Sequence, residues 1–415
     1  MLSPSGPALA PPPAPSDHVG RPSPWHSPDY RLLLVGTFLA VLGMWVQQIG
    51  QGWYVLQLTG SAFDLSLVQA VSAVPMLVFG LLGGVVADRL DRRTLIIVTR
   101  SLIAALSFLL GVLMLVGWAP LAVVLLVTGL AGIVWAFDLP ARQAMVPQLV
   151  HPRARTAAIA WVSTALNAGR ILGPALGGIA LGFIGAAGCV LVSALGYVGM
   201  VMLAARIRPL PPQRREQRDL ARDLMVGLRY CLAQPTVLGL LLLAAAMIVF
   251  WQAHVVLLPV FARDVLAAGA SGYGLLSAAS GVGALAGTLS IALAPARRQG
   301  AAMAVLAVSA GGGLLLWAQV TNFFLSLVLL VLATACGMAT STLTTSMLQR
   351  ITPDHLQGRV MSVALLTWGA SPVGLLLAGA LADLGGAPFS VMVTSSLALA
   401  ASVGVLLLVP GVRRL

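Results

Sequence analysis

Charged residues are scarce in this 415-residue chain, and lysine is missing altogether. Asp, Glu, Lys and Arg together make up 9% of the residues, compared with roughly 25% in ordinary soluble domains. All 24 basic residues are arginines, and only 12 residues are acidic. Because 59% of the chain is hydrophobic, it does not supply enough polar surface to face water on all sides. This composition excludes a soluble globular protein.

Cysteine and histidine are too few and too scattered to form a metal site. The three cysteines and five histidines show neither a C-x-x-C pair nor an H-E-x-x-H spacing, so we expect no disulfide and no metal. The chain also lacks a G-x-S-x-G nucleophile elbow and a Walker phosphate loop. A polytopic membrane enzyme would need clustered His, Asp, Glu or Cys. We therefore predict no enzyme activity, no cofactor and no ATP-driven step.

The chain contains long apolar runs without charged residues. Each is about 20 residues long, the length that a helix needs to cross roughly 30 Å of hydrocarbon. Backbone groups in lipid must be satisfied internally, so spans this apolar should be helices. We predict an all-α membrane protein with twelve transmembrane helices. The predicted spans are 31–58, 66–88, 94–116, 120–141, 156–184, 187–206, 236–260, 273–294, 300–319, 323–348, 359–383 and 388–409.

The arginines occur in alternate segments between the predicted spans. Arg100 and Arg170 lie within spans, Arg263 is exterior, and the others fall on loops or helix ends of one side. The positive-inside rule then places both termini in the cytoplasm, with the chain in a bacterial inner membrane. The +12 net charge is thus a topology signal and not a nucleic-acid footprint. The arginine-free segments that we expect outside are Gly117–Pro120, Gly185–Gly188 and Val320–Asn322.

Internal repetition divides the chain into two halves. Gly173 of the fifth span recurs as Gly374 in the eleventh, and Gln47 of the first recurs as Gln252 in the seventh. Parallel halves related about the membrane normal are a known transporter plan. We predict a disordered Pro-rich lead, a six-helix half, a basic linker with an amphipathic helix, a second six-helix half and a short tail. Their ranges are 1–30, 31–206, 207–235, 236–410 and 411–415.

A short charged loop, Gly83–Arg93, separates the second and third predicted spans. It resembles the signature loop between helices 2 and 3 of the major facilitator superfamily, with Asp91 where that family usually has glycine. The resemblance implies a gate in which Asp88 pairs with a loop arginine or with the helix terminus near Gln357, shutting the cytoplasmic side. The residues that match the gate motif are Gly84, Asp88, Arg89, Arg92 and Arg93.

Three further segments resemble one particular branch of this superfamily. Phe137–Ala144, Asn167–Gly178 and Gln357–Ser362 are similar to corresponding parts of the branch that holds enterobactin exporters and macrolide-type or multidrug efflux proteins. The resemblance implies that a monomer exports a siderophore or a drug-like molecule in exchange for protons. Drug/proton antiporters usually carry an arginine in helix 4, and the segment 128–132 has none. The usual proton relay is therefore not expected.

The fifth span also carries the core of a motif that the family associates with antiport. Its proline removes a backbone donor and bends the helix, and glycines four residues apart leave a smooth face for packing. Ordinary helix packing is the alternative interpretation. We expect Gly283 and Gly287 of span 8 to form the facing groove. The motif residues are Gly169, Gly173, Pro174, Gly177 and Gly178.

Polar side chains on one face of the first span predict a substrate cavity. An unpaired amide in lipid costs roughly 2–7 kcal/mol, so the glutamines should face either a watery cavity or another helix. Span 7 offers mirrored polar residues, span 10 offers hydroxyls, and tryptophans can stack on a ring system. The predicted cavity residues are Met44, Gln47, Gln48, Gln51, Trp135, Gln252, His254, Ser341, Thr345 and Trp368.

Asp138 is the acid that lies deep enough to count as intramembrane. Arg142 follows one helical turn later, and Arg100 and Arg170 lie within neighbouring spans. We hypothesise that Asp138 takes up and releases a proton while these arginines compete for its carboxylate, because burial favours the neutral form and a nearby cation the charged form. A purely structural ion pair is the alternative. His254 is then the next candidate for the proton.

Two other functions remain open from the sequence. A metabolite importer has the same fold, although the few charges in the spans disfavour sugar phosphates and dicarboxylates. A non-transporting membrane sensor is the second, and a ligand-flux assay separates it from a transporter.

Overall fold

The computed structural model describes residues 23–209, 220–293 and 299–414. All regular elements in these ranges are helices. The predicted lead falls mostly outside the described residues, and so does part of the predicted linker. The first group of helices is α1 (Pro28–Thr59), α2 (Ala62–Arg89), α3 (Arg92–Leu115), α4 (Leu121–Met145) and α5 (Arg155–Arg206). The second group is α6 (Leu220–Ala233), α7 (Pro235–Ala246), α8 (His254–Val260), α9 (Gly269–Leu293), α10 (Gln299–Trp317), α11 (Phe323–Ile351), α12 (Asp354–Thr367), α13 (Ser371–Leu408) and α14 (Pro410–Arg414).

Ten helical segments of the described chain are long and apolar enough to cross a membrane. Two of them, Pro152–Arg206 and Asp354–Leu408, are 55 residues long and bend at a single glycine. Gly185 has φ 68° and Gly386 has φ 85°, a left-handed conformation that glycine adopts without steric cost. Division at these bends gives the predicted twelve spans. The break predicted between the fifth and sixth spans falls at Gly185, where one glycine redirects the chain and the helix resumes immediately.

The seventh predicted span, 236–260, is an interrupted helix. Two π-helical turns, η4 (Met247–Trp251) and η5 (Phe261–Val265), lie on either side of α8. Gly374 of α13 leaves no room for a Cβ beside the carbonyl of Val249 in η4, so the irregular turn packs directly on the other helix. The eleventh predicted span, 359–383, is also interrupted, by the 3₁₀ turn η6 (Trp368–Ala370). Such turns within helices often occur at functional sites.

Local capping explains where several helices begin. The hydroxyls of Ser27 and Ser61 accept hydrogen bonds from backbone amides in the first turns of α1 and α2. Asp91 does the same for α3, accepting from the amides of Arg93 and Thr94. Each bond satisfies an amide that the helix itself leaves without a partner. The acid that departs from the family pattern is thus the residue that starts α3.

The two groups of helices meet through equivalent elements. In the first group α2 and α3 pack on α4, and in the second the corresponding α9 and α10 pack on α11. Between the groups, α5 packs on α9 and α13 packs on α2. Gly178 lies against Gly274 at the first contact, and Gly379 lies against Ser66 at the second. The fifth and eleventh spans therefore use corresponding glycines to join the halves, as the internal repeat suggests.

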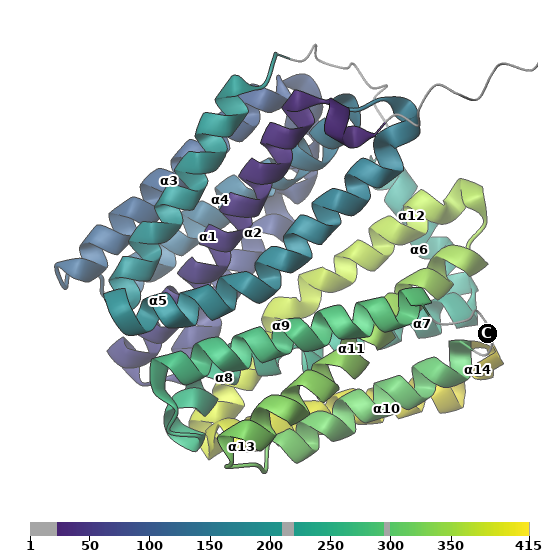
Figure 1. Ribbon diagram of the computed structural model, residues 1–415. Helices are drawn as coiled ribbons and strands as arrows, with labels where there is room; N and C mark the ends of the chain where they lie inside the picture. Colours follow the sequence, from purple (N-terminus) through teal and green to yellow (C-terminus); the bar gives the residue numbers. More distant parts are fainter. Residues whose placement is uncertain (1–22, 210–219, 294–298, 415) are drawn as a thin grey trace, which may run out of the picture.

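Figure 1 shows that the halves lie together at one end and diverge toward the other. The joined end contains the junction of α1 and α2 and the bend of α13, and the diverging end contains α12 and α6. The described chain begins and ends on the diverging side (Figure 1).

Candidate substrate cavity and charge cluster

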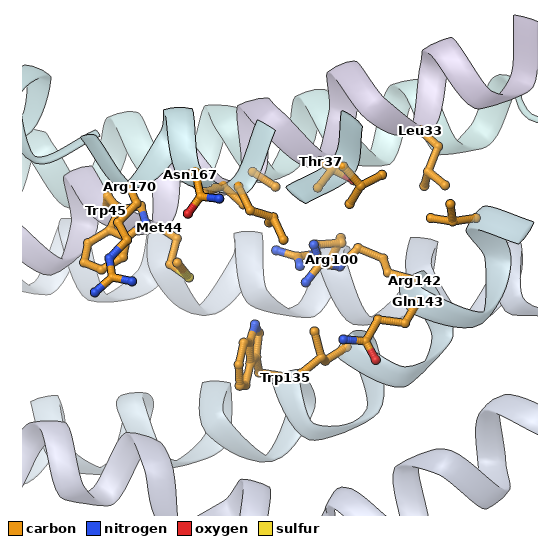
Figure 2. Close-up of a pocket in the computed structure, with 16 residues that line it drawn as sticks. Leu33, Thr37, Met44, Trp45, Arg100, Trp135, Arg142, Gln143, Asn167 and Arg170 are labelled. Carbon is orange, nitrogen blue, oxygen red and sulfur yellow. The ribbon is translucent and has the colours of Figure 1, made fainter. Parts of the chain in front are cut away.

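Two cavities of about 290 Å³ each lie among the helices of the first half. Met44 of α1 and Trp135 of α4 line both of them, so the cavities are neighbours separated by these side chains. Figure 2 shows the first cavity, with Arg170 and Trp45 near one end and Leu33 near the other. A third, smaller cavity of about 40 Å³ lies between the halves and shares Trp45, Gln48 and Arg170 with its neighbours.

The predicted glutamines of α1 line these cavities and also connect helices. Gln47 Oε1 accepts hydrogen bonds from the hydroxyls of Ser107, Ser193 and Tyr197 at 3.0–3.1 Å. Gln51 Nε2 donates to Thr128 Oγ1 at 2.7 Å. The two interpretations that the sequence left open thus apply together. Each amide is held by neighbouring helices, and the same side chain contributes to the cavity wall.

Asp138 of α4 is fully buried and paired with two arginines. Arg100 of α3 donates to both of its oxygens, with Nε at 2.8 Å from Oδ1 and one terminal nitrogen close to Oδ2. Arg142 Nε lies 2.9 Å from Oδ2, one turn along α4. Thr99 Oγ1 adds a hydrogen bond of 3.1 Å to Oδ1. The predicted pair of Asp138 with Arg142 and the predicted reach of Arg100 are confirmed.

Tyr197 of α5 links this charge cluster to the cavity glutamines. The guanidinium carbon of Arg100 lies 5.7 Å from the centre of the Tyr197 ring, within the range of a cation–π contact. The hydroxyl of the same tyrosine donates to Gln47 Oε1. The connection runs from Gln47 through Tyr197 and Arg100 to Asp138, and it ties α1, α3, α4 and α5 together. The sequence analysis did not identify Tyr197, because nothing in local spacing signals a contact between distant helices.

Arg170 of α5 does not join this cluster, contrary to the predicted competition for Asp138. It makes no hydrogen bond or ion pair with any described residue. Its side chain lines both the first cavity and the cavity between the halves. Figure 2 places it beside Trp45, away from Arg100 and Arg142. The reason is distance along the cavity, since Met44 lies between the two groups of arginines (Figure 2).

The predicted cavity residues of the second half do not line the three cavities. His254 is buried between Trp251 and Trp317, and its Nδ1 lies 2.7 Å from the carbonyl of Trp251. Thr345 donates to the carbonyl of Ser341 along α11 itself. The physical reason is that these side chains are engaged within the second half: aromatic rings enclose His254, and the Thr345 hydroxyl bonds back to its own helix. The other two residues of this set are Gln252, which is half-buried, and Trp368, which is 53% exposed.

The basic residues of the predicted gate motif hold helix ends together. Arg92 donates to the carbonyls of Ala87 and Ala144, and Arg93 donates to those of Ala204 and Ala205. These carbonyls lie in the last turns of α2, α4 and α5, where cations stabilise the helix termini. Gly84 has open space around it and Arg89 is exposed. The predicted pairing of Asp88 falls on a side chain outside the described residues.

The glycine face of the fifth span packs on α1. A Cβ at Gly169 would meet Val41, one at Gly173 would meet Trp45, and one at Gly177 would meet Ile49. The predicted groove on span 8 is wrong. Its glycines face α11 instead, because there the backbone carbonyls of that helix approach too closely for a side chain. These two residues are Gly283 and Gly287.

Asp383 of α13 is a contact that the sequence analysis missed. Its carboxylate accepts hydrogen bonds from the hydroxyl of Ser61 at 2.6 Å and from the amide of Ala62 at 2.7 Å, which cap α2 of the other half. Nearby, Arg263 donates to the carbonyl of Leu56 at 2.9 Å, again across the halves. No local pattern reveals these bonds, since each joins segments far apart in the sequence.

Membrane-length helices, two joined halves and a polar cavity near their seam define a multi-pass membrane transporter. The fold is that of a bacterial homolog of the human lysosomal transporter Spinster, solved in an inward-facing and unoccupied conformation. That structure matches with a TM-score of 0.72 at 16% identity, over 93% of this chain and 97% of that one. The family model of transmembrane secretion effectors matches residues 20–413. The chain belongs to this family, and the predicted major facilitator fold and branch are confirmed.

Three relatives show which transporters the chain resembles. The staphyloferrin A transporter of Staphylococcus aureus is 27% identical over 369 residues, covering 87% of this chain and 92% of that protein. The multidrug efflux pump Tap of Mycolicibacterium fortuitum is 27% identical over 369 residues, covering 86% and 89%. The enterobactin exporter EntS of Escherichia coli is 28% identical over 337 residues, covering 80% of each chain. Family and fold are those of transporters.

Proposed function

We propose that this protein is a secondary active transporter that exports an amphipathic small molecule, either a siderophore or a drug-like compound. The observation that carries the proposal is the pair of adjoining cavities, in which tryptophan and aliphatic side chains alternate with glutamines and arginines. Such a lining suits a ligand with both apolar and polar parts. The names of the three relatives, two of them siderophore transporters and one a multidrug pump, support the same substrate range.

Transport proceeds by rocking of the two halves. The contacts of Asp383 with the start of α2 and of Arg263 with the end of α1 close the joined end. We assign that end to the exterior, since the segments predicted outside lie there. The structure then corresponds to the state open toward the cytoplasm, in which a substrate enters. The reverse state requires these bonds to break while the cytoplasmic ends approach.

Proton exchange supplies the energy in this proposal. Asp138 is the acid buried among the helices of the cavity-bearing half, and its two arginines lie on different helices, α3 and α4. A rearrangement that separates α3 from α4 weakens the pairing, so burial favours proton uptake. Renewed pairing with Arg100 expels the proton. The chain acts as a monomer in the inner membrane, with both termini in the cytoplasm.

A deletion strain tests the function directly. Cells that lack the gene are compared with cells that carry it on a plasmid or carry the empty plasmid, in growth against a toxin panel and in metabolite profiles of the medium. We expect the deletion to lower the secreted amount of at least one amphipathic compound, or to raise sensitivity to one, and the plasmid copy to restore it. Identical profiles and identical growth in all three strains would contradict export. A compound that is depleted from the medium only when the gene is present would indicate import instead.

A further inference from the structure

The charged side chains that line the cavities are all arginines. Arg100, Arg142 and Arg170 line the first cavity, and Arg170 also lines the cavity between the halves. The glutamine-lined cavity has no charged residue in its wall. Asp138 is fully buried and does not line any of the three. A ligand in this region therefore meets positive charge first.

The single buried acid does not balance these arginines. Asp138 accepts hydrogen bonds from both Arg100 and Arg142, so the cluster of three keeps one net positive charge. Arg170 adds a second, since it has no hydrogen-bonding or ion-pair partner among the described residues. An uncompensated ion in a low-dielectric interior is costly, and such residues within a membrane span mark a substrate pathway.

The surroundings of Arg170 are those of a ligand-binding group. Its backbone carbonyl lies where α5 meets Gly281 of α9, which places the residue at the seam that moves when the halves rock. Figure 2 shows its guanidinium beside the Trp45 ring, with Met44 and Trp135 further along the cavity and Asn167 above. A charged fork and apolar surfaces thus face the same volume of about 290 Å³.

We propose that the substrate is an amphipathic anion, and that Arg170 binds its carboxylate while Trp45 and Trp135 pack against its apolar part. This inference rests on the proposed export function and names the substrate class. The planar guanidinium offers two parallel N–H donors that match a carboxylate. A cation of the same shape is rejected, because it would approach unpaired like charges. An inorganic anion satisfies the arginine but leaves the aromatic side chains without a partner.

Binding of three matched naphthalene compounds tests the charge of the substrate. The full-length protein in lipid nanodiscs is titrated calorimetrically with naphthalene-2-carboxylate, naphthalene-2-carboxamide and naphthalen-2-ylmethylammonium. We expect the carboxylate to bind at least about tenfold more tightly than the amide, since a hydrogen bond to a charged group contributes more than one to a neutral group. We expect the ammonium compound to bind most weakly. Phosphate alone should not compete with the carboxylate.

Variants at Arg170 test whether this side chain causes the preference for the carboxylate. Arg170→Gln should lower carboxylate affinity by about tenfold and leave amide affinity unchanged. Arg170→Lys should retain part of the preference, because it keeps the charge but loses the fork. Arg153→Gln is the matched control, since Arg153 is exposed and lies outside the cavities. Arg170 makes no bond that a fold would lose, so both variants are expected to remain folded.

The proposal is overturned if the amide or the ammonium compound binds as tightly as the carboxylate, or if naphthalene-2-carboxylate does not bind at all. It is also overturned if Arg170→Gln weakens all three compounds equally. Export observed in the deletion-strain comparison would remain valid evidence for the proposed function in either case. Conversely, a carboxylate preference that depends on Arg170 would survive a failure of that comparison, so the two claims are separable.

Discussion

At the scale of single residues, the buried cluster around Asp138 is the centre of the proposed proton coupling. Removing one member of a buried ion pair typically costs about 3–5 kcal/mol, because the remaining charge is left without compensation. Here the carboxylate receives bonds from Thr99, Arg100 and Arg142, so its lone pairs are well satisfied. In the proposed coupling, the Asp138 carboxylate changes its protonation only when the helices that carry its partners move.

Substitution of Asp138 by asparagine should uncouple transport from the pH gradient. Asp138→Asn keeps the shape but removes the group that exchanges a proton, so proteoliposomes should show downhill exchange without accumulation. Because two arginines would be left unbalanced, Asp138→Asn is compared with the double variant Asp138→Asn/Arg142→Gln, which restores the charge of the cluster. Both are expected to be uncoupled. If either variant still concentrates substrate when a pH gradient is imposed, Asp138 is only structural.

The residue types at the site were partly predictable from the sequence. Asp138 and Arg142 share one helix at a spacing that places them on one face, and the glutamines of α1 follow the same rule. The local sequence around Tyr197 and Asp383 did not indicate their contacts, because their partners come from helices whose packing is set by the whole bundle. His254 was predicted in the cavity from its mirrored position, yet the aromatic rings of Trp251 and Trp317 enclose it.

At the scale of elements, the start of α2 is held by an acid of the other half. Asp383 accepts from the amides of Ala62 and Phe63 and from the hydroxyl of Ser61, and so supplements the cap that Ser61 itself provides. Anions are stabilised at a helix amino terminus by the exposed amides and the helix dipole. The contact thus favours the conformation in which α13 and α2 are together.

Loss of the Asp383 carboxylate should shift the protein toward the exterior-open state. An N-cap contributes typically about 1 kcal/mol, which corresponds to a several-fold change in the ratio of the two conformations. Asp383→Ala is compared with Asp64→Ala. Asp64 is an acid in the first turn of α2, and among the described residues its side chain forms no bond across the halves. Spin-label distances between the first turn of α2 and α13 should lengthen on average in Asp383→Ala alone. Equal distance distributions in both variants would show that the contact of Asp383 with the start of α2 does not hold the halves together.

A side chain at Gly178 should push the halves apart. A Cβ there would meet the backbone of Gly274, and overpacking of this kind typically costs about 1–3 kcal/mol. Gly178→Ala should therefore reduce transport and lower the thermal midpoint. Gly182→Ala lies one turn further on the same helix, where a Cβ would make only an ordinary contact at 3.5 Å with Ser271. Equal transport rates in the two variants would show that this contact does not matter.

Helix boundaries were predictable only where local chemistry sets them. The serine and asparagine caps of α1, α2 and α11 lie within a few residues of the predicted span starts. The breaks at Gly185 and Gly386 lie between spans as predicted, but the sequence did not show that each is a single left-handed glycine, because such a glycine and a longer loop look alike in sequence. The π turn η4 packs closely against Gly337 and Gly374, a contact that single-sequence patterns do not encode.

At the scale of the whole molecule, the scarcity of charge determines the architecture. Almost all of the described chain is helical because lipid offers the backbone no alternative partner, and the two halves follow from the repeat. The fold was therefore predictable from composition, span length and the resemblance of its loops. The charge of the first cavity was not predictable, since it depends on which arginines remain unpaired after folding. The sequence alone disfavoured sugar phosphates and dicarboxylates as substrates, whereas the arrangement of Arg170 and its neighbours favours an amphipathic carboxylate.

Uptake into everted membrane vesicles tests the central claim that this protein is a proton-driven exporter. The compound identified from the deletion strain is added to vesicles whose interior is acidified by respiration. We predict that vesicles with the wild-type protein accumulate the compound, that nigericin abolishes the accumulation, and that vesicles with Asp138→Asn do not accumulate it. Accumulation no greater than in vesicles without the protein, or accumulation that persists after the gradient is collapsed, would contradict it.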